Sequence, residues 1–324
     1  MRIALPPRID AGALADRDPT ATLVDLGGET MGTSWSVRLA ATPGFDGAAV
    51  FRAIKARLGT IVAEMSHWSP ASDLSRFNRA PGGRWVSLAP DFAHVMAAAL
   101  DIAARTGGAF DPAIGAIVDI WGFGPVAIDA PPDAAAIDAA RGVSGWHRLA
   151  FDPGARRLHQ PGGLALDLSG IAKGHAVDMV ADLLQSVGIR HCLVEIGGEL
   201  VGRGVRPDGD PWWVDLESPP NMPLPPLRIA LHGLAVATSG NYRRGAHTLD
   251  PRTGYPVDGD MLSVSVIHDR AMLADAWATA LTVASNAAEL AAAAEIAARI
   301  VTIANGHPHE HITPALTAML ADDG

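Results

Sequence analysis

The chain has 324 residues, of which 48% are hydrophobic and 19% charged. This balance is typical of folded globular proteins, and it excludes both a highly charged disordered chain and a coiled coil. The formal charge is −10, from 25 lysine and arginine residues against 35 aspartate and glutamate residues, so binding to nucleic acid is not expected.

Residues 1–20 are interrupted by prolines and charges, which predicts an irregular leader without the apolar core of a signal peptide. Cys192 is the single cysteine, so there is no internal disulfide, no multi-cysteine metal site and no lipid-accepting cysteine near the start. No window of about 18 uninterrupted apolar residues predicts a transmembrane segment. As written, the chain is expected to be cytoplasmic.

The first half of the chain alternates strand and helix patterns. Residues 22–26 and 35–39 alternate apolar and polar residues, which predicts a hairpin around the glycines between them. Apolar residues recur at helical spacing over 46–65 and again over 91–105, where Thr106, Gly107 and Gly108 end the second helix. An alanine-rich helix is expected over 133–141.

The second half predicts short strands around one helix and a long helical end. Strands are expected over 147–151, 157–159, 164–168, 192–196, 227–231, 234–238 and 261–267, and helices over 172–187 and 271–304, the latter broken near Asn286. The prolines of 219–226 predict an irregular connection. Strands and helices interleave without a strict βαβ rhythm, so we expect a mixed α+β fold.

Two segments predict an anion and a cation site. Residues 167–178 read as a strand end, a Ser-Gly turn and a helix start with Lys173, where free backbone N–H groups favour a phosphate. Asp275 and Thr279 lie four residues apart and so share a helix face, where a carboxylate and a hydroxyl suit Mg²⁺. Taken alone, each segment is better explained as an ordinary capped helix start.

Two further segments are weaker. His247 precedes a Pro-Gly turn over 250–254 and is a candidate general base, although the turn itself is ordinary loop chemistry. Aromatic residues lie beside glycine-rich loops over 65–78, 106–115 and 121–124. They could bind a flat ring between them, or they could simply cover the core.

Taken together and in this order, these segments resemble the ApbE family, the FAD:protein FMN transferases. The resemblance covers about residues 28–290 and rests on Met31-Gly-Thr-Ser-Trp35, Met65 to Asn78, Gly108 to Pro112, Trp121 to Gly124, Asp167 to Asp178, Ile196 to Glu199, Thr238 to Tyr242, His247 to Gly254, and Ala274 to Thr279. It implies a mixed-sheet α+β domain over 21–310 with helices packed on the sheets, followed by a C-terminal tail over 311–324.

The resemblance also implies an activity: Mg²⁺-dependent cleavage of the FAD pyrophosphate, release of AMP, and attachment of FMN to a threonine or serine of an acceptor protein. The backbone carbonyl of Ala172 with Asp275 and Thr279 would hold Mg²⁺, and His247 would take the acceptor proton. Lys173 and Arg252 are further phosphate-side candidates. The residues that would line the FAD site are Met31, Trp68, Ala109, Phe110, Asp111, Ser169, His175 and Leu249.

Trp68 and His175 stand where the family commonly has tyrosine, which keeps a flat ring and removes a hydroxyl. An FAD pyrophosphatase that passes FMN to water, and a flavin-binding protein without turnover, remain alternatives. The partner is expected to be a flavoprotein subunit with an Asp-x-x-Thr/Ser-x-Ala-Thr type motif. This chain contains no such motif, so self-modification is not expected.

Overall fold

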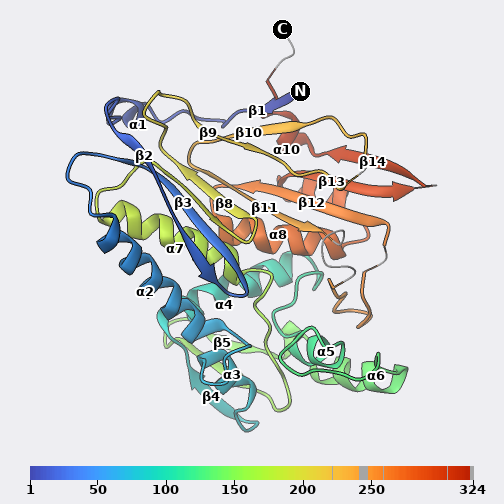
Figure 1. The fold of residues 1–324 in the computed structure, drawn as a ribbon. Coiled ribbons are helices and arrows are strands. Elements are labelled where there is room, and N and C mark those ends of the chain that lie inside the picture. Colours follow the sequence, from blue (N-terminus) through green and yellow to red (C-terminus); the bar gives the residue numbers. More distant parts are fainter. Residues whose placement is uncertain (221, 241–246, 258, 305, 322–324) are drawn as a thin grey trace.

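A computed structural model describes residues 1–220, 222–240, 247–257, 259–304 and 306–321. Eight strands among these residues form the main sheet, in the order β14-β13-β12-β11-β8-β7-β3-β2 (Figure 1). They are β2 (Thr22–Thr30), β3 (Thr33–Ala41), β7 (Cys192–Ile196), β8 (Glu199–Arg203), β11 (Leu234–Gly240), β12 (Met261–His268), β13 (Ala297–Ala304) and β14 (His307–Ile312). Each neighbouring pair is antiparallel.

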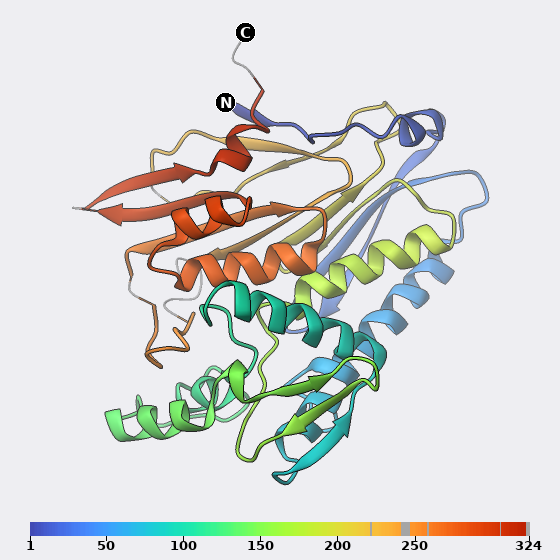
Figure 2. The ribbon, with the colours of Figure 1, turned by 180° about the vertical axis from the view of Figure 1, so that it is seen from behind.

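Helices cover one face of this sheet and enclose the larger core (Figure 2). The packed helices are α2 (Gly47–Met65), α4 (Pro90–Arg105), α7 (Ala172–Ser186), α8 (Ala271–Val283) and α9 (Ala287–Ala293). The predicted helices over 46–65, 91–105 and 172–187 are thereby confirmed. Asp46 caps α2 by accepting from the backbone N–H of Ala49, and the apolar face of that helix, including Ile54, Leu58 and Ile61, is buried.

The opposite face of the main sheet packs on a three-stranded sheet and a second core. That sheet contains β1 (Arg2–Ala4), β10 (Leu227–Leu231) and β9 (Trp212–Asp215), with α10 (Pro314–Thr317) beside it. The expected irregular leader is wrong, because residues 2–4 are a strand parallel to β10 and residues 11–15 form α1 (Ala11–Ala15). The expected tail is also part of the fold, because its residue Leu320 forms a β-bridge with Ala4. The partners of residues 2–4 and of Leu320 lie far along the sequence, so no local pattern predicts these two pairings.

A third group of elements lies below the helices in Figure 1. It contains the sheet β4-β6-β5, with β4 (Arg84–Ser87), β6 (Arg157–Gln160) and β5 (Ala150–Asp152), together with α3 (Asp73–Asn78), α5 (Gly115–Ile120), α6 (Ala134–Val143) and a 3₁₀ turn at Trp146–Arg148. The predicted strand over 164–168 is wrong. Its backbone is bonded by the Asn78 side chain at Leu166 and by loop atoms around Pro112 and Gly115 instead of by a sheet.

The long C-terminal helix predicted over 271–304 is also wrong beyond Ala293. The segment contains α8 and α9, and then β13, which lies between β12 and β14. Residues 299–303 are Arg-Ile-Val-Thr-Ile, a β-branched run that favours a strand, and Ile300 and Val301 are buried there. The alanines on both sides of this run favour a helix, and they hide the change from a helical to a strand pattern in the sequence.

One end of the main sheet gathers the loops that carry the candidate residues. The β2–β3 turn, the β7–β8 turn and the segment after β11 all lie there, because these strands pair in antiparallel register with Trp35 opposite Ile196 and Val236 opposite Leu200. None of the helices in the described part of the chain is long and apolar enough to cross a membrane.

Candidate functional site

The start of α7 lies directly against α8 where two glycines permit it. A side chain on Gly170 would come within 2.8 Å of the Thr279 hydroxyl, and one on Gly174 within 2.8 Å of Cβ of Asp275. The backbone N–H of Gly174 donates to Oδ2 of Asp275 at 3.0 Å. Ala172 lies between these two glycines in the sequence, so the segment that carries its carbonyl packs against the helix that carries Asp275 and Thr279.

Replacing Gly174 by alanine should lower the free energy of unfolding by about 1–3 kcal/mol, because the new methyl group would lie 2.2 Å from the carbonyl oxygen of Ala271. Gly59, in the exposed middle of α2, is a matched control because nothing lies within 4 Å of its Cβ position. Gly59→Ala should stabilise the protein by up to about 1 kcal/mol. Urea unfolding of both variants checks this, and equal effects would contradict the close α7–α8 contact.

Lys173 joins two buried carboxylates at this point. Its ammonium donates to Oε1 of Glu199 and lies 3.9 Å from Oδ1 of Asp275. Burial raises the pKa of Glu199 to about 7 and raises the pKa of Asp275, against the opposing pull of Lys173. Oε2 of Glu199 is buried without a hydrogen-bond partner among the described residues. The two carboxylates of Glu199 and Asp275 share one ammonium group, so this buried position can accept a further positive charge such as a cation.

Glu199 was absent from the residues assigned to the site from sequence. It follows Gly197 and Gly198 in the β7–β8 turn, both of which have positive φ. A side chain on Gly197 would meet Thr33 of the β2–β3 turn, where Met31 also has positive φ and packs at the edge of the core. An acid directly after a double-glycine turn was the signal available in the sequence.

The end of β11 leads from the cation residues to His247. The Ser239 hydroxyl lies 3.5 Å from that of Thr279. The motif that runs on to Tyr242 passes into residues 241–246, outside the described part of the chain. His247 is exposed, whereas Leu249 is buried against Ile117 and Ala140 of α5 and α6. Leu249 therefore anchors this loop in the third group of elements.

The rest of that loop is fixed by side-chain hydrogen bonds. Arg252 forms a two-bond ion pair with Asp250 and donates to the carbonyl oxygen of Val283 at the end of α8. Trp121 donates to the carbonyl oxygen of Gly254 at 2.8 Å. The structure thus gives Arg252 a bracing position between the His247 loop and α8.

A cavity of about 260 Å³ lies beside the segment that leads to α7. Exposed Trp68 lines it together with His67, Asn78, Asp119 and Asp167. Asp167 accepts from both the backbone N–H and the hydroxyl of Ser169. Burial raises the pKa of Asp119. Residues 167–172 therefore connect an aromatic cavity to the carboxylate cluster.

The loop of Ala109, Phe110 and Asp111 is packed against the same segment. Ala109 and Phe110 are buried in the main core, and the carbonyl oxygen of Pro112 accepts from the N–H of Asp167 at 2.9 Å. Asp111 accepts from the N–H groups of Ala113 and Trp146, and burial raises its pKa to about 6. These residues support the wall of the cavity rather than line its open part.

His175 is 1% exposed and faces α4, where Nε2 lies 3.7 Å from Asp91 and the ring contacts His94. The ring is enclosed by protein and does not face an open cavity in this structure. The assignment of His175 to the FAD site therefore remains a prediction. Burial lowers the pKa of His175 to about 4.

This buried imidazole should make the protein less stable in mild acid. The unfolded chain binds the proton near the ordinary histidine pKa of about 6.5, and the folded chain does not until about 4, so stability should fall as the pH drops through that interval. His175→Gln should show a smaller loss of unfolding free energy between pH 7 and pH 5 than the parent protein. Identical losses in urea titrations would contradict this.

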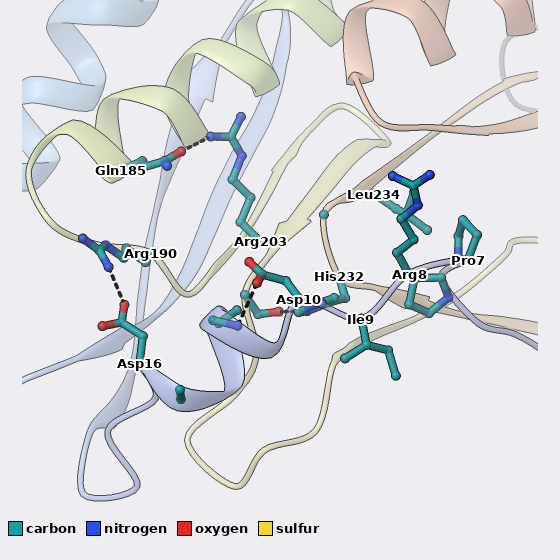
Figure 3. Close-up of a pocket in the computed structure, with 16 residues that line it drawn as sticks. Pro7, Arg8, Ile9, Asp10, Asp16, Gln185, Arg190, Arg203, His232 and Leu234 are labelled. Atoms are coloured by element: carbon teal, nitrogen blue, oxygen red, sulfur yellow. Dashed lines mark hydrogen bonds and ion pairs between the residues drawn. The ribbon is translucent and has the colours of Figure 1, made fainter.

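A larger hollow of about 980 Å³ lies at the opposite end of the main sheet, between the N-terminal segment and the end of β8 (Figure 3). Several of its polar groups are bound within the protein: Arg190 pairs with Asp16, Arg203 with Gln185, and His232 with the backbone of Asp10 and Gly204. These bonds fasten the N-terminal segment to the sheet.

The described residues contain no cluster of three or more histidine, cysteine or acidic side chains arranged to hold a metal. The cation set described above has a different composition, with one carboxylate, one hydroxyl and one backbone carbonyl.

Comparison with known proteins gives a consistent result. The model of the ApbE family matches residues 31–301. A FAD:protein FMN transferase from Vibrio cholerae serotype O1 is 36% identical over 281 residues, covering 83% of this chain and 84% of that protein. One from Escherichia coli K12 is 33% identical and covers 80% of this chain and 77% of its own length.

Solved structures agree with the sequence comparison. The flavin transferase ApbE from Vibrio cholerae superposes with a TM-score of 0.87 at 33% identity, covering 92% of this chain and 99% of that chain. The apo flavinyl transferase ApbE from Pseudomonas stutzeri gives a TM-score of 0.86 at 33% identity, covering 92% and 97%. The expected mixed α+β fold is confirmed.

Proposed function

The chain belongs to the ApbE family, and we propose that it is a Mg²⁺-dependent FAD:protein FMN transferase whose domain spans residues 21–310. The observation that supports the proposal is the close packing of Gly170 and Gly174, on either side of Ala172, against Thr279 and Asp275, beside a buried carboxylate atom without a partner among the described residues. The names of the similar proteins supply the reaction class.

The donor set fits Mg²⁺. Hard cations prefer oxygen ligands, and this place offers the Asp275 carboxylate, the Thr279 hydroxyl one helical turn later, and the Ala172 carbonyl. When bound, the cation would neutralise charge on the pyrophosphate under attack. Lys173 keeps the carboxylates of Glu199 and Asp275 close together although burial disfavours their charge.

The pyrophosphate would lie at the first turn of α7. This helix runs 15 residues, and the positive end of its dipole favours an anion. The N–H groups expected to be free are partly used within the protein: those of Ala172 and Gly174 donate to the Leu168 carbonyl oxygen and to Asp275. The flat flavin ring would enter the cavity beside Trp68, whose exposed indole can stack on it. Ser169, held by Asp167, and Met31, at the edge of the main core, would also border the ligand.

Transfer then requires one bond exchange. The hydroxyl oxygen of an acceptor threonine or serine would attack the FMN phosphorus, the bond to the AMP oxygen would break, and AMP would leave. His247, exposed on its anchored loop, would take the hydroxyl proton. The acceptor segment would approach from solvent, because Leu249 and Arg252 hold the two sides of this loop on the protein.

Chromatography of AMP and FMN tests the proposal and separates it from FAD hydrolysis. The purified protein is incubated with FAD, with or without Mg²⁺ and with or without an acceptor domain. We expect AMP release to require Mg²⁺ and to rise with the acceptor while free FMN stays low. Equal AMP and free FMN without the acceptor would identify a pyrophosphatase, and bound FAD without AMP under any condition would identify a flavin-binding protein.

A further inference from the structure

Strand β14 carries three histidines that have no place in the proposed transfer reaction. His307, His309 and His311 alternate along the strand, so their side chains share one face of the sheet. All three are exposed, and in the described part of the chain none of their side chains has a hydrogen bond, ion pair or ring contact. Three exposed imidazoles on one face of a strand offer nitrogen ligands that a metal ion can bind.

The opposite face of β14 has a different composition. Glu310 points there and accepts from Arg2 and Arg299, while Ile312 packs on the second core. The strand is therefore fixed in register by its inner face while the histidines remain outward. Pro308 lacks an N–H donor, which suits a sheet edge and makes β14 a poor template for another strand.

The spacing decides how a metal ion could be held. Alternate residues of a strand lie about 7 Å apart, and two imidazoles at that spacing can bind one ion, whereas His307 and His311, about 14 Å apart, cannot. His309 is therefore common to both usable pairs. The residue opposite it on β13 is Thr302, whose hydroxyl is the polar group nearest in register.

We propose that this edge binds a divalent late transition-metal ion such as Cu²⁺, Ni²⁺ or Zn²⁺ through His309 together with His307 or His311. Imidazole suits these ions, and Mg²⁺ prefers oxygen. The hairpin of β13 and β14 projects past α9, so the site is open to solvent and to a further ligand (Figure 2).

A titration of the tag-free chain with Cu²⁺, followed by electron paramagnetic resonance, and with Zn²⁺, followed by calorimetry, tests this site. We expect about one equivalent to bind with nitrogen coupling to Cu²⁺, and excess Mg²⁺ to leave binding unchanged. His309→Gln should weaken binding tenfold or more. His307→Gln and His311→Gln should each weaken it less, because one pair remains.

Two further variants complete the design. The double change His307→Gln with His311→Gln leaves His309 alone and should match the loss in His309→Gln. His94→Gln removes an exposed histidine from α4 and should bind metal as the parent does. A His309→Gln protein that unfolds at the parent temperature but still binds Cu²⁺ as tightly as the parent, or losses equal at all three positions, would overturn the proposal.

Discussion

Replacing Asp275 by asparagine is expected to reduce Mg²⁺-dependent release of AMP from FAD by at least about a hundredfold. Asp275 supplies the one carboxylate of the proposed cation set, and it is 3% exposed against the start of α7. An amide of the same shape keeps an oxygen for the N–H of Gly174 and loses the negative charge. The remaining hydroxyl and carbonyl ligands bind a divalent cation weakly without it.

The fold should survive this change. Burial raises the pKa of Asp275, which means that the folded protein disfavours its charge, so removing the charge should leave the unfolding temperature equal or higher. Lys173 retains its bond to Glu199. The rate of AMP release across a Mg²⁺ titration, measured beside thermal unfolding, separates loss of the cation from loss of structure.

Asp269→Asn is the matched control, since Asp269 lies just before α8 with its side chain 73% exposed. That variant should cleave FAD at the parent rate. Thr279→Val, which removes only the hydroxyl, should raise the Mg²⁺ concentration needed for half-maximal rate. An Asp275→Asn protein with parent activity and an unchanged Mg²⁺ response would remove Asp275 from the proposed site.

The second large effect is expected at His247. His247→Gln should slow transfer of FMN to an acceptor by about a hundredfold or more and leave FAD affinity nearly unchanged. The side chain is exposed, while the loop is held elsewhere by Leu249 and by Arg252 on the carbonyl of Val283. The contacts of Leu249 and Arg252 remain in His247→Gln, so we expect the loop to keep its anchors while the proton acceptor is lost.

Single-turnover transfer with preformed enzyme and FAD, alongside equilibrium FAD binding, measures the two effects separately. Thr248→Val alters the neighbouring residue and should have little effect on either quantity, because the carbonyl of Thr248 still accepts from Val257. Parallel losses of affinity and rate in His247→Gln would instead assign His247 to ligand binding.

The local parts of the fold could be predicted from the sequence, and the distant pairings could not. The hairpin around Met31 and the helices α2, α4 and α7 follow from the period of apolar residues in their own segments, and Asp46 also caps α2. The sequence predicts a helix where β13 lies because alanines flank that strand, and it predicts no strand at β1 because the partner of β1 is the distant β10. Tertiary pairing decides β1, whereas the β-branched run inside β13 itself favours a strand and only the flanking alanines favour a helix.

The candidate site shows the same division. Asp275 and Thr279 share a helix face, which spacing alone predicts, and family resemblance added Ala172. The contact between α7 and α8 depends on Gly170 and Gly174. The hydrogen bond from Lys173 to Glu199 joins residues 26 positions apart, so spacing within one segment does not predict it. Burial of His175 against Asp91 depends on how α7 packs on α4, which one helix cannot reveal.

The most direct measurement is the intact mass of an acceptor domain after incubation with the protein, FAD and Mg²⁺, with AMP quantified in the same sample. The account predicts one covalently attached FMN per acceptor and an equal amount of AMP, both abolished when the acceptor threonine or serine is changed to alanine. An acceptor of unchanged mass, while FAD is consumed to AMP and free FMN, would contradict it.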